Sequence, residues 1–292
     1  MLVASKMTRS VCALLCALAI AWPAVTHAEE TDWDKRFHTQ VQQWMNTIIE
    51  RDPSFRDWKN ARIDAQSLGA NQHQWLVSIT RDGRQVGYMV VGESPASGTQ
   101  PTFVLLEYGV GEYILFDDAF APRAVAAEPV YDGFASHWLV ARQEQRELVD
   151  AKTGETYPAS AVTGPPVITT LSEAELVRPE ERLTAARVLS GAVQDPFDRI
   201  DWLTDTSNRR QLTWTDLWQK TSAGPVTLTV PLHHSNVLAP FAVQSLHLWN
   251  GRAAYVGVWD EGLRFVPYAY AMKVGQFHAV DTGAHKTSSL PE

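Results

Sequence analysis

Hydrophobic residues near the start of the sequence recur at the spacing of an α-helix. One stripe of a 3.6-residue period holds Phe37, Val41, Trp44, Met45, Ile48 and Ile49. Asp32 or Asp34 suits the first turn, and Pro53 ends the segment because proline cannot continue a helix. The pattern predicts one amphipathic helix whose apolar stripe packs against the core.

After this helix the pattern changes to short apolar runs separated by turn residues. Residues 75–79 and 86–91 flank Asp82-Gly83, a dipeptide typical of tight hairpins because both turn positions need positive φ. Further strands are expected at residues 102–106, 113–116, 137–141 and 146–150. For residues 29–158 we therefore predict an α+β domain, with one helix over a meandering antiparallel sheet.

Residues 157–170 interrupt this alternation. The segment reads YPASAVTGPPVITT and holds three prolines and a glycine among small polar residues. Such a composition favours an irregular connection. We predict a linker at residues 159–170 between two domains.

The second half mixes helical and strand patterns. Ser172 and Glu175 have the spacing of a capping box and Gly191 is a stop signal, which together predict a helix over residues 172–189. Asn250-Gly251 between apolar runs is the strongest hairpin signal in the chain. Other strands are expected at residues 226–232, 263–266 and 277–280, and short helices at 215–218 and 267–274.

These patterns define the expected fold class. Residues 171–280 should form a C-terminal α+β domain, followed by a flexible tail at 281–292. The whole chain is then α+β with two domains, each a small antiparallel sheet with one or a few helices.

The first 28 residues have the features of a cleavable signal peptide. Lys6 and Arg9 precede an apolar run at residues 11–22, and Pro23 follows it. A helix of that length spans about 18 Å, whereas a bilayer core is about 30 Å thick, so the alternative of a membrane anchor is disfavoured. We expect cleavage near Ala28 and secretion to the extracellular space or cell envelope. No later segment has the length of a transmembrane anchor.

Both cysteines, Cys12 and Cys16, lie in this apolar run. Removal of the signal peptide therefore leaves a cysteine-free mature chain. Such a chain has no disulfide, no thiolate metal ligand and no cysteine nucleophile.

Charge excludes one class of partner. The whole chain carries a formal charge of −8, and loss of Lys6 and Arg9 with the signal peptide leaves −10. Affinity for nucleic acid comes mostly from Lys and Arg that neutralise phosphates. We therefore expect no nucleic-acid partner.

Several short motifs in the first half occur in a recognisable order. They are Phe55, Asp57-Trp58-Lys59-Asn60-Ala61, Val86-Gly87-Tyr88, Leu106-Glu107-Tyr108-Gly109 and Tyr113. Over residues 33–120 this order resembles the N-terminal, prodomain-like (streptopain-propeptide-like) module of secreted bacterial papain-like (C39-type) peptidases. Residues 147–155 are similar to the closing hairpin of PepSY-type modules, another secreted family tied to protease control. The resemblance implies an accessory module with a secreted peptidase as partner.

The second half departs from that family. In the peptidases such a module precedes a domain with a cysteine nucleophile and a histidine. Residues 250–268 resemble the last strands of a papain-like domain, yet the mature chain has no cysteine. Because no residue can supply the thiolate, the implied catalysis is absent.

Other catalytic and metal-binding patterns are incomplete. Residues 92–96 are the nearest match to a serine-hydrolase motif, but the second glycine is missing and Pro95 lacks the N–H that an oxyanion hole requires. His233-His234 could join His247, although neighbouring residues on a strand point to opposite faces. We predict no catalytic residues, no metal site and no cofactor.

Residues 195–202 are the strongest remaining candidate for a binding site. Asp195, Asp198 and Asp201 lie close to Trp202, an arrangement that could bind a sugar or peptide by stacking and hydrogen bonding. The alternative is a structural connection with aspartate caps and buried aromatic residues, which we favour.

The sequence thus indicates an exported, non-catalytic binding or accessory protein that modulates a secreted peptidase or contacts a cell-wall component. The alternative is a carboxylate-dependent extracellular hydrolase directed at glycans, which would use Asp195, Asp198 or Asp201. Glycoside hydrolysis needs two carboxyl groups about 5–10 Å apart across a cleft.

Overall fold

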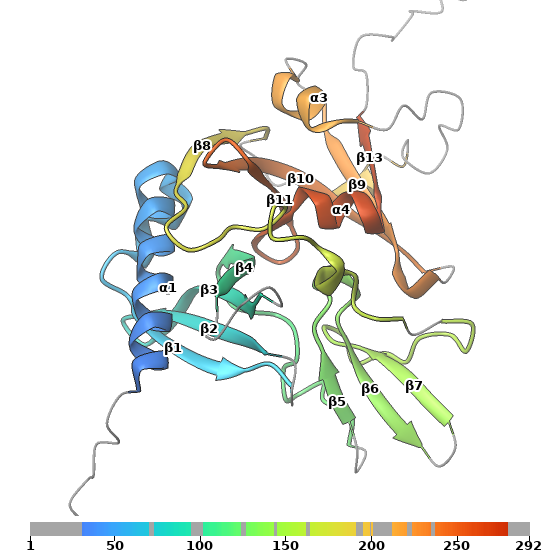
Figure 1. Ribbon diagram of the computed structural model, residues 1–292. Coiled ribbons are helices and arrows are strands. Elements are labelled where there is room, and N and C mark those ends of the chain that lie inside the picture. The colour runs from blue at the N-terminus through green and yellow to red at the C-terminus, as the bar shows by residue number, and fades with distance from the viewer. Residues whose placement is uncertain are drawn as a thin grey trace, which may run out of the picture.

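The computed structural model describes most of the chain after the predicted signal peptide (Figure 1). The described residues are 31–69, 73–94, 102–123, 127–142, 145–161, 164–190, 195–198, 200, 212–220, 224–234 and 237–279. The predicted signal peptide and tail lie outside them.

A ten-stranded antiparallel sheet forms the frame of the molecule. Its order is β1 (Arg62–Ser67), β2 (Gln74–Arg81), β3 (Arg84–Glu93), β4 (Phe103–Val110), β12 (Leu263–Pro267), β11 (Ala253–Trp259), β10 (Leu238–Trp249), β9 (Val226–Pro231) and β13 (Gln276–Ala279). Strand β8 (Leu183–Val188) also pairs with β10. Strands from the two halves of the chain therefore lie in one sheet.

The remaining elements are a small sheet and several helices. The three-stranded sheet contains β5 (Ala127–Val130), β6 (His137–Arg142) and β7 (Gln145–Asp150). The α-helices are α1 (Asp32–Arg51), α3 (Trp214–Gln219) and α4 (Tyr268–Val274). The 3-10 helices are η1 (Pro53–Trp58), η2 (Gly133–Ala135), η3 (Val167–Thr170), η4 (Pro196–Asp198) and η5 (Leu232–His234). No helix in the described residues is long and apolar enough to cross a membrane.

Helix α1 covers one face of the large sheet, as the stripe in its sequence predicts (Figure 1). Its buried residues contact side chains that alternate along the strands, such as Met89 and Val91 on β3 and Leu105 on β4. A Thr31–Asp34 capping box starts the helix. Asp52 ends it and accepts a hydrogen bond from the Ser54 N–H at 2.8 Å, which turns the chain into η1.

The opposite face is covered by the small sheet, η3 and α4. Here Tyr88 and Val90 of β3 contact a second hydrophobic cluster with Leu148 of β7, Ile168 of η3 and Tyr270 of α4. Successive side chains of a strand point to opposite faces, so β3 supplies both clusters. The sheet is therefore buried on both sides over its centre.

The two predicted tight hairpins are confirmed. Asp82 and Gly83 have φ of 52° and 77°, and Asn250 and Gly251 have φ of 46° and 67°. All four angles lie in the left-handed region that such turns need. The Asn250-Gly251 turn joins β10 to β11.

The α+β class with antiparallel sheets is confirmed, but the strands are distributed differently from the expected two small sheets. Strand β4 pairs with β12, where Phe265 lies opposite Tyr108 and Leu263 opposite Val110. Both hydrophobic clusters also draw residues from both halves. The large sheet contains strands from both sides of residues 159–170. That the two halves fold independently of each other stays a prediction.

Two predicted elements are wrong. Residues 172–189 form a turn and then β8 instead of a helix. The Ser172–Glu175 bonds exist, but the Leu105 N–H donates to Val177 O at 3.0 Å and draws the chain onto the sheet edge. Residues 113–116 were expected to form a strand but do not. Phe116 has a φ of 62°, which an extended strand does not allow, and its N–H donates to Ala151 O at 2.8 Å.

Candidate functional site

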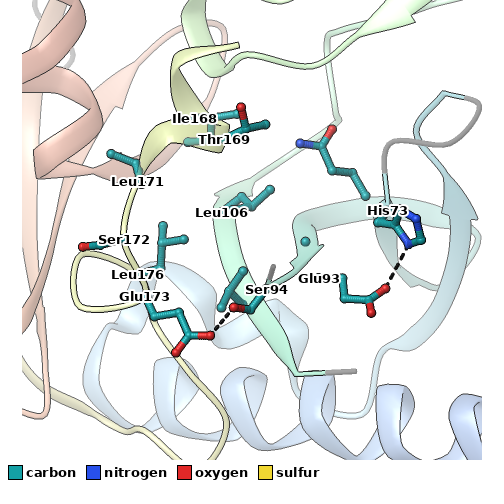
Figure 2. Close-up of a pocket in the computed structure, with 13 residues that line it drawn as sticks. His73, Glu93, Ser94, Leu106, Ile168, Thr169, Leu171, Ser172, Glu173 and Leu176 are labelled. Atoms are coloured by element: carbon teal, nitrogen blue, oxygen red, sulfur yellow. Dashed lines mark hydrogen bonds and ion pairs between the residues drawn. The ribbon is translucent and has the colours of Figure 1, made fainter. Parts of the chain in front are cut away.

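A cavity of about 600 Å³ lies between the large sheet and the segment that contains η3 (Figure 2). Its lining residues come from the ends of β2, β3 and β4 and from the wall segment, defined here as residues 167–176. They are His73, Gln74, Gly92, Glu93, Ser94, Val104, Leu106, Ile168, Thr169, Leu171, Ser172, Glu173 and Leu176. This volume is typical of pockets that bind small molecules.

Apolar side chains form the floor of the cavity. In Figure 2 the Leu106 side chain extends from β4 below Ile168 and Thr169 of the wall segment. The β3–β4 register shifts so that Val90 faces Glu107 while Val91 faces Leu105, which makes Leu106 an extra residue. This β-bulge explains how Leu106 and the neighbouring Glu107 both contribute to the same side of the sheet.

Two side chains from elsewhere in the fold, the buried Asp132 and the partly exposed Arg252, hold the wall segment in place. The Ile168 N–H donates to Asp132 Oδ1 at 2.8 Å. The Arg252 guanidinium donates to the carbonyl oxygens of Glu173 at 3.1 Å and Leu176 at 2.8 Å, and also to that of Ala174. These bonds satisfy backbone groups that a helix would otherwise have paired, and they fix an irregular segment as a defined wall.

Burial raises the pKa of the Asp132 carboxyl to about 6, although hydrogen bonds from the backbone of Ile168 and Val167 oppose that rise. Asp132 is only 7% exposed. The carboxyl that anchors the wall segment therefore titrates close to neutral pH.

The rim of the cavity is polar and carries two glutamates. Ser94 Oγ donates to Glu173 Oε1, and His73 Nδ1 lies 3.0 Å from Glu93 Oε2. Figure 2 shows these as two separate pairs, with His73 bonded to Glu93 and Ser94 bonded to Glu173.

Gln74 adds an unsatisfied acceptor to this lining. The residue is 4% exposed, and its Oε1 atom has no hydrogen-bond partner in the described residues. Burial of an unpaired amide oxygen costs about 1–3 kcal/mol. An atom of this kind beside a cavity indicates a place for a hydrogen-bond donor from a ligand.

A buried ionic cluster lies behind the cavity floor, centred on Glu107 and Arg264. Arg264 donates to both Glu107 oxygens, at 3.0 and 3.2 Å, and also to Asp260. Tyr88 and Tyr131 donate to Glu107 at 2.6 and 2.8 Å. Glu107 is fully buried and does not line the cavity, so this cluster is a structural support that ties β4 to β12.

A second buried network joins Asp52, His247 and Tyr108. Asp52 Oδ2 lies 2.9 Å from His247 Nε2, and Tyr108 Oη lies 2.8 Å from His247 Nδ1. Burial would raise the pKa of Asp52, but bonds from His247 and Ser54 outweigh it and hold that pKa below its usual value. The carboxylate accepts from Nε2–H, and Tyr108 donates to Nδ1, which gives a fully paired neutral histidine.

This network has the residue types of a proton relay, but its residues are buried inside the protein, where they stabilise the fold. Burial lowers the pKa of His247 and raises that of Tyr108, and neither residue has measurable exposure. Trp249 Nε1 donates to Tyr108 Oη at 3.2 Å and completes the bonding. The network links the end of α1 to β4 and β10.

The sequence-predicted candidates Asp195 and Asp198 lie on the surface at η4, away from the cavity lining. Asp195 Oδ1 accepts from the Phe197 N–H at 2.8 Å, as in a capped turn. Phe197 is 65% exposed, so the expected burial of the aromatic residue does not occur there. Asp201 and Trp202 lie outside the described residues.

The histidines considered together in the sequence belong to different clusters. His247 contacts Asp52 and Tyr108, whereas the His233 ring packs against His137 and Tyr157 at 4.7 and 4.6 Å between centroids. In the part of the chain that the structure describes, no group of three His, Cys, Asp or Glu side chains could hold a metal ion.

In the sequence, Ser94 stands out only as part of an incomplete serine-hydrolase motif, and no local pattern indicates the cavity. His73 and Gln74 are adjacent, but Glu173 lies about 100 positions further along the chain, and none of the three belongs to a motif. Their grouping depends on the sheet and on the bonds from Asp132 and Arg252. The apolar run at the start of β4 indicates that Leu106 is buried but not that it faces a cavity.

Comparisons with known proteins give no relative for this chain. No family model, curated protein or solved structure matches it.

Proposed function

We propose that this chain is an exported, non-catalytic binding protein that takes a small ligand into the cavity between the large sheet and the wall segment. The observation that supports this most strongly is a cavity of about 600 Å³ with an apolar floor, a polar rim and a buried unpaired amide oxygen. Pockets that bind small molecules share this combination.

The polar pairs at the rim favour binding over catalysis. A serine nucleophile needs a base that accepts its proton, most often a histidine. Ser94 donates directly to Glu173, and the His73 ring bonds Glu93 instead of Ser94 (Figure 2). The lining residues that the structure describes therefore offer hydrogen-bonding groups without a Ser–His pair.

The proposed location and partner of this binding protein are inferred from the sequence. The signal-peptide pattern supports export, and the likeness to prodomain-like modules supports an accessory role beside a secreted peptidase. A cell-wall component is the other partner class. We do not propose the glycan-directed hydrolase. Of its three candidate acids, Asp195 and Asp198 are exposed and do not line the cavity, and Asp201 lies outside the described residues.

Titration of the mature protein with 1-octanol, followed by methyl NMR, tests the binding function. We expect saturable shifts of the methyl signals of Leu106, Leu171 and Leu176. The variant Leu106→Trp should lose them because the indole fills the cavity. Val188→Trp adds the same ring at a position that is 63% exposed, and it should bind like wild type. Absence of saturable shifts in the wild-type protein with every ligand of this chain length, neutral or charged, would refute the proposed site.

A further inference from the structure

We propose that the ligand of this cavity is an amphipathic amine, with an apolar body over Leu106 and Leu171 and an ammonium group at the polar rim. The inference rests on the proposed binding function and specifies the chemical class of ligand. It is carried by the balance of donors and acceptors in the lining and by its charge.

The lining has unused acceptors. Glu173 uses Oε1 for Ser94 and Glu93 uses Oε2 for His73, which leaves the second oxygen of each carboxylate for a ligand. Gln74 Oε1 has no partner in the described residues and is enclosed. A ligand that binds here gains most if it brings hydrogen-bond donors.

The hydroxyl groups of the lining already donate hydrogen bonds within the protein. Ser94 donates to Glu173, Thr169 Oγ1 donates to Pro166 O at 2.7 Å, and Ser172 Oγ donates to Glu175 Oε2 at 2.8 Å. A carboxylate or phosphate ligand would therefore meet few donors and several acceptors.

The charges of the lining residues also favour a ligand that carries a positive charge. Among the described residues, the lining contains two carboxylates and neither Lys nor Arg. Arg252 and Lys273 donate to backbone carbonyls of the wall segment, at Glu173 and Thr170 among others, but neither lines the cavity. His73 is the only basic side chain that the described part of the lining contains, and it is 69% exposed and bonded to Glu93. A cation is favoured over a neutral molecule, and an anion is disfavoured.

The apolar floor of the cavity favours an amine with an apolar body over a sugar as the ligand. A sugar also brings donors, but its hydroxyl groups would lose their hydration against Val104, Leu106, Ile168, Leu171 and Leu176. An alkyl or aryl amine places its apolar body there and presents three N–H donors, with no acceptor, to the rim.

A series of ligands with one apolar chain and three head groups tests this inference. Octylamine, 1-octanol and octanoate are titrated into the mature protein at pH 7 by calorimetry. We expect octylamine to bind at least tenfold more tightly than 1-octanol, and octanoate to bind more weakly than either. Equal affinity for octylamine and 1-octanol would overturn the inference while leaving the proposed function intact. If none of the three binds, the proposed function fails as well.

Matched variants test whether the polar rim of the cavity causes the preference for octylamine over 1-octanol. The double variant Glu93→Gln/Glu173→Gln should lose the preference for octylamine and keep its affinity for 1-octanol, which also shows that the cavity is intact. Gln74→Met should lower the affinity for octylamine severalfold. Glu128→Gln removes an exposed carboxylate of β5 that does not line the cavity, and it should keep the preference. A preference that survives in the double variant contradicts a role for the two glutamates.

Discussion

Gly87 and Trp58, two residues of the motif order noted in the sequence, are in direct contact. A Cβ atom at Gly87 would lie 1.9 Å from Trp58 Nε1 and 2.4 Å from Cε2. The Trp58 N–H donates to Val86 O at 3.3 Å, so the ring lies close over the backbone of β3. The absence of a side chain at residue 87 thus makes room for the indole.

Gly87→Ala should therefore destabilise the protein. The indole must move out of its site and lose its bond to Val86, which we expect to lower the free energy of unfolding by about 2–4 kcal/mol. Urea unfolding followed by tryptophan fluorescence measures the change. Gly164→Ala is the matched control because a Cβ atom added there would have nothing within 4 Å, and it should change stability by less than about 0.5 kcal/mol. Equal midpoints for both variants would contradict this packing.

Glu107→Gln should cost more than the loss of any surface ion pair. It leaves Arg264 without its bidentate partner in a fully buried position, and breaking a pair of this kind costs about 3–5 kcal/mol. Asp57→Asn removes the partner of Arg81 at a pair whose side chains are 50% and 44% exposed, and it should cost less than about 1 kcal/mol. Chemical denaturation of both variants compares them, and similar losses would show that the buried cluster adds little.

At the scale of elements, the wall segment depends on contacts that its own sequence does not contain. Its backbone bonds to Asp132 from the segment before β6 and to Arg252 from the turn before β11. Local patterns predicted a proline-rich linker and a capped helix there. The Ser172–Glu175 signal exists in the structure, but three carbonyls of the segment bond Arg252 instead of continuing a helix.

Asp132 should make stability depend on pH in a defined direction. Its folded-state pKa of about 6 lies above its usual value of 3.8, so the protonated form is favoured in the fold. Its stabilising contribution is complete below about pH 3.8 and is lost as the pH rises through about 6. The difference of about two pKa units corresponds to about 3 kcal/mol.

Asp132→Asn removes this dependence. We expect the stability of the variant relative to wild type to rise by up to about 3 kcal/mol between pH 4 and pH 7. Burial lowers the pKa values of His137 and His247, whose contributions are lost as the pH falls, but these are common to both proteins and cancel in the comparison. Urea midpoints at pH 4.5, 5.5 and 7.5 give the profile. Parallel profiles for variant and wild type would show that Asp132 does not titrate in this range.

The elements that the sequence predicted well are those encoded by local patterns. The stripe from Phe37 to Ile49 forms α1, and Asn250-Gly251 forms a tight hairpin because its backbone angles follow from two adjacent residues. The pairing of β4 with β12 joins residues about 150 positions apart, and no local signal specifies it. The cavity depends on that long-range arrangement, which is why its lining was not predicted.

At the scale of the whole molecule, the two halves share one sheet and two hydrophobic clusters. Separation would expose the edges of β4 and β12. It would also leave Glu107 without Arg264 and Asp52 without His247. Buried charges without partners and open strand edges both oppose folding of the separate halves.

We therefore expect fragments 29–158 and 159–280 to lack cooperative unfolding when each is produced alone. Near-ultraviolet circular dichroism and hydrogen exchange should show loose structure in each fragment and recovery of native signals when the two are expressed together. Cooperative unfolding of fragment 29–158 by itself would contradict this account and would support the predicted domain boundary.

The central claim is that the space between the large sheet and the wall segment is a ligand site. Its most direct test is a crystal structure of the mature protein grown with saturating octylamine. We predict electron density for the alkyl chain among Leu106, Leu171 and Leu176, with the nitrogen within hydrogen-bonding distance of Gln74, Glu93 or Glu173. An empty cavity in crystals whose protein binds octylamine at another surface would contradict the account.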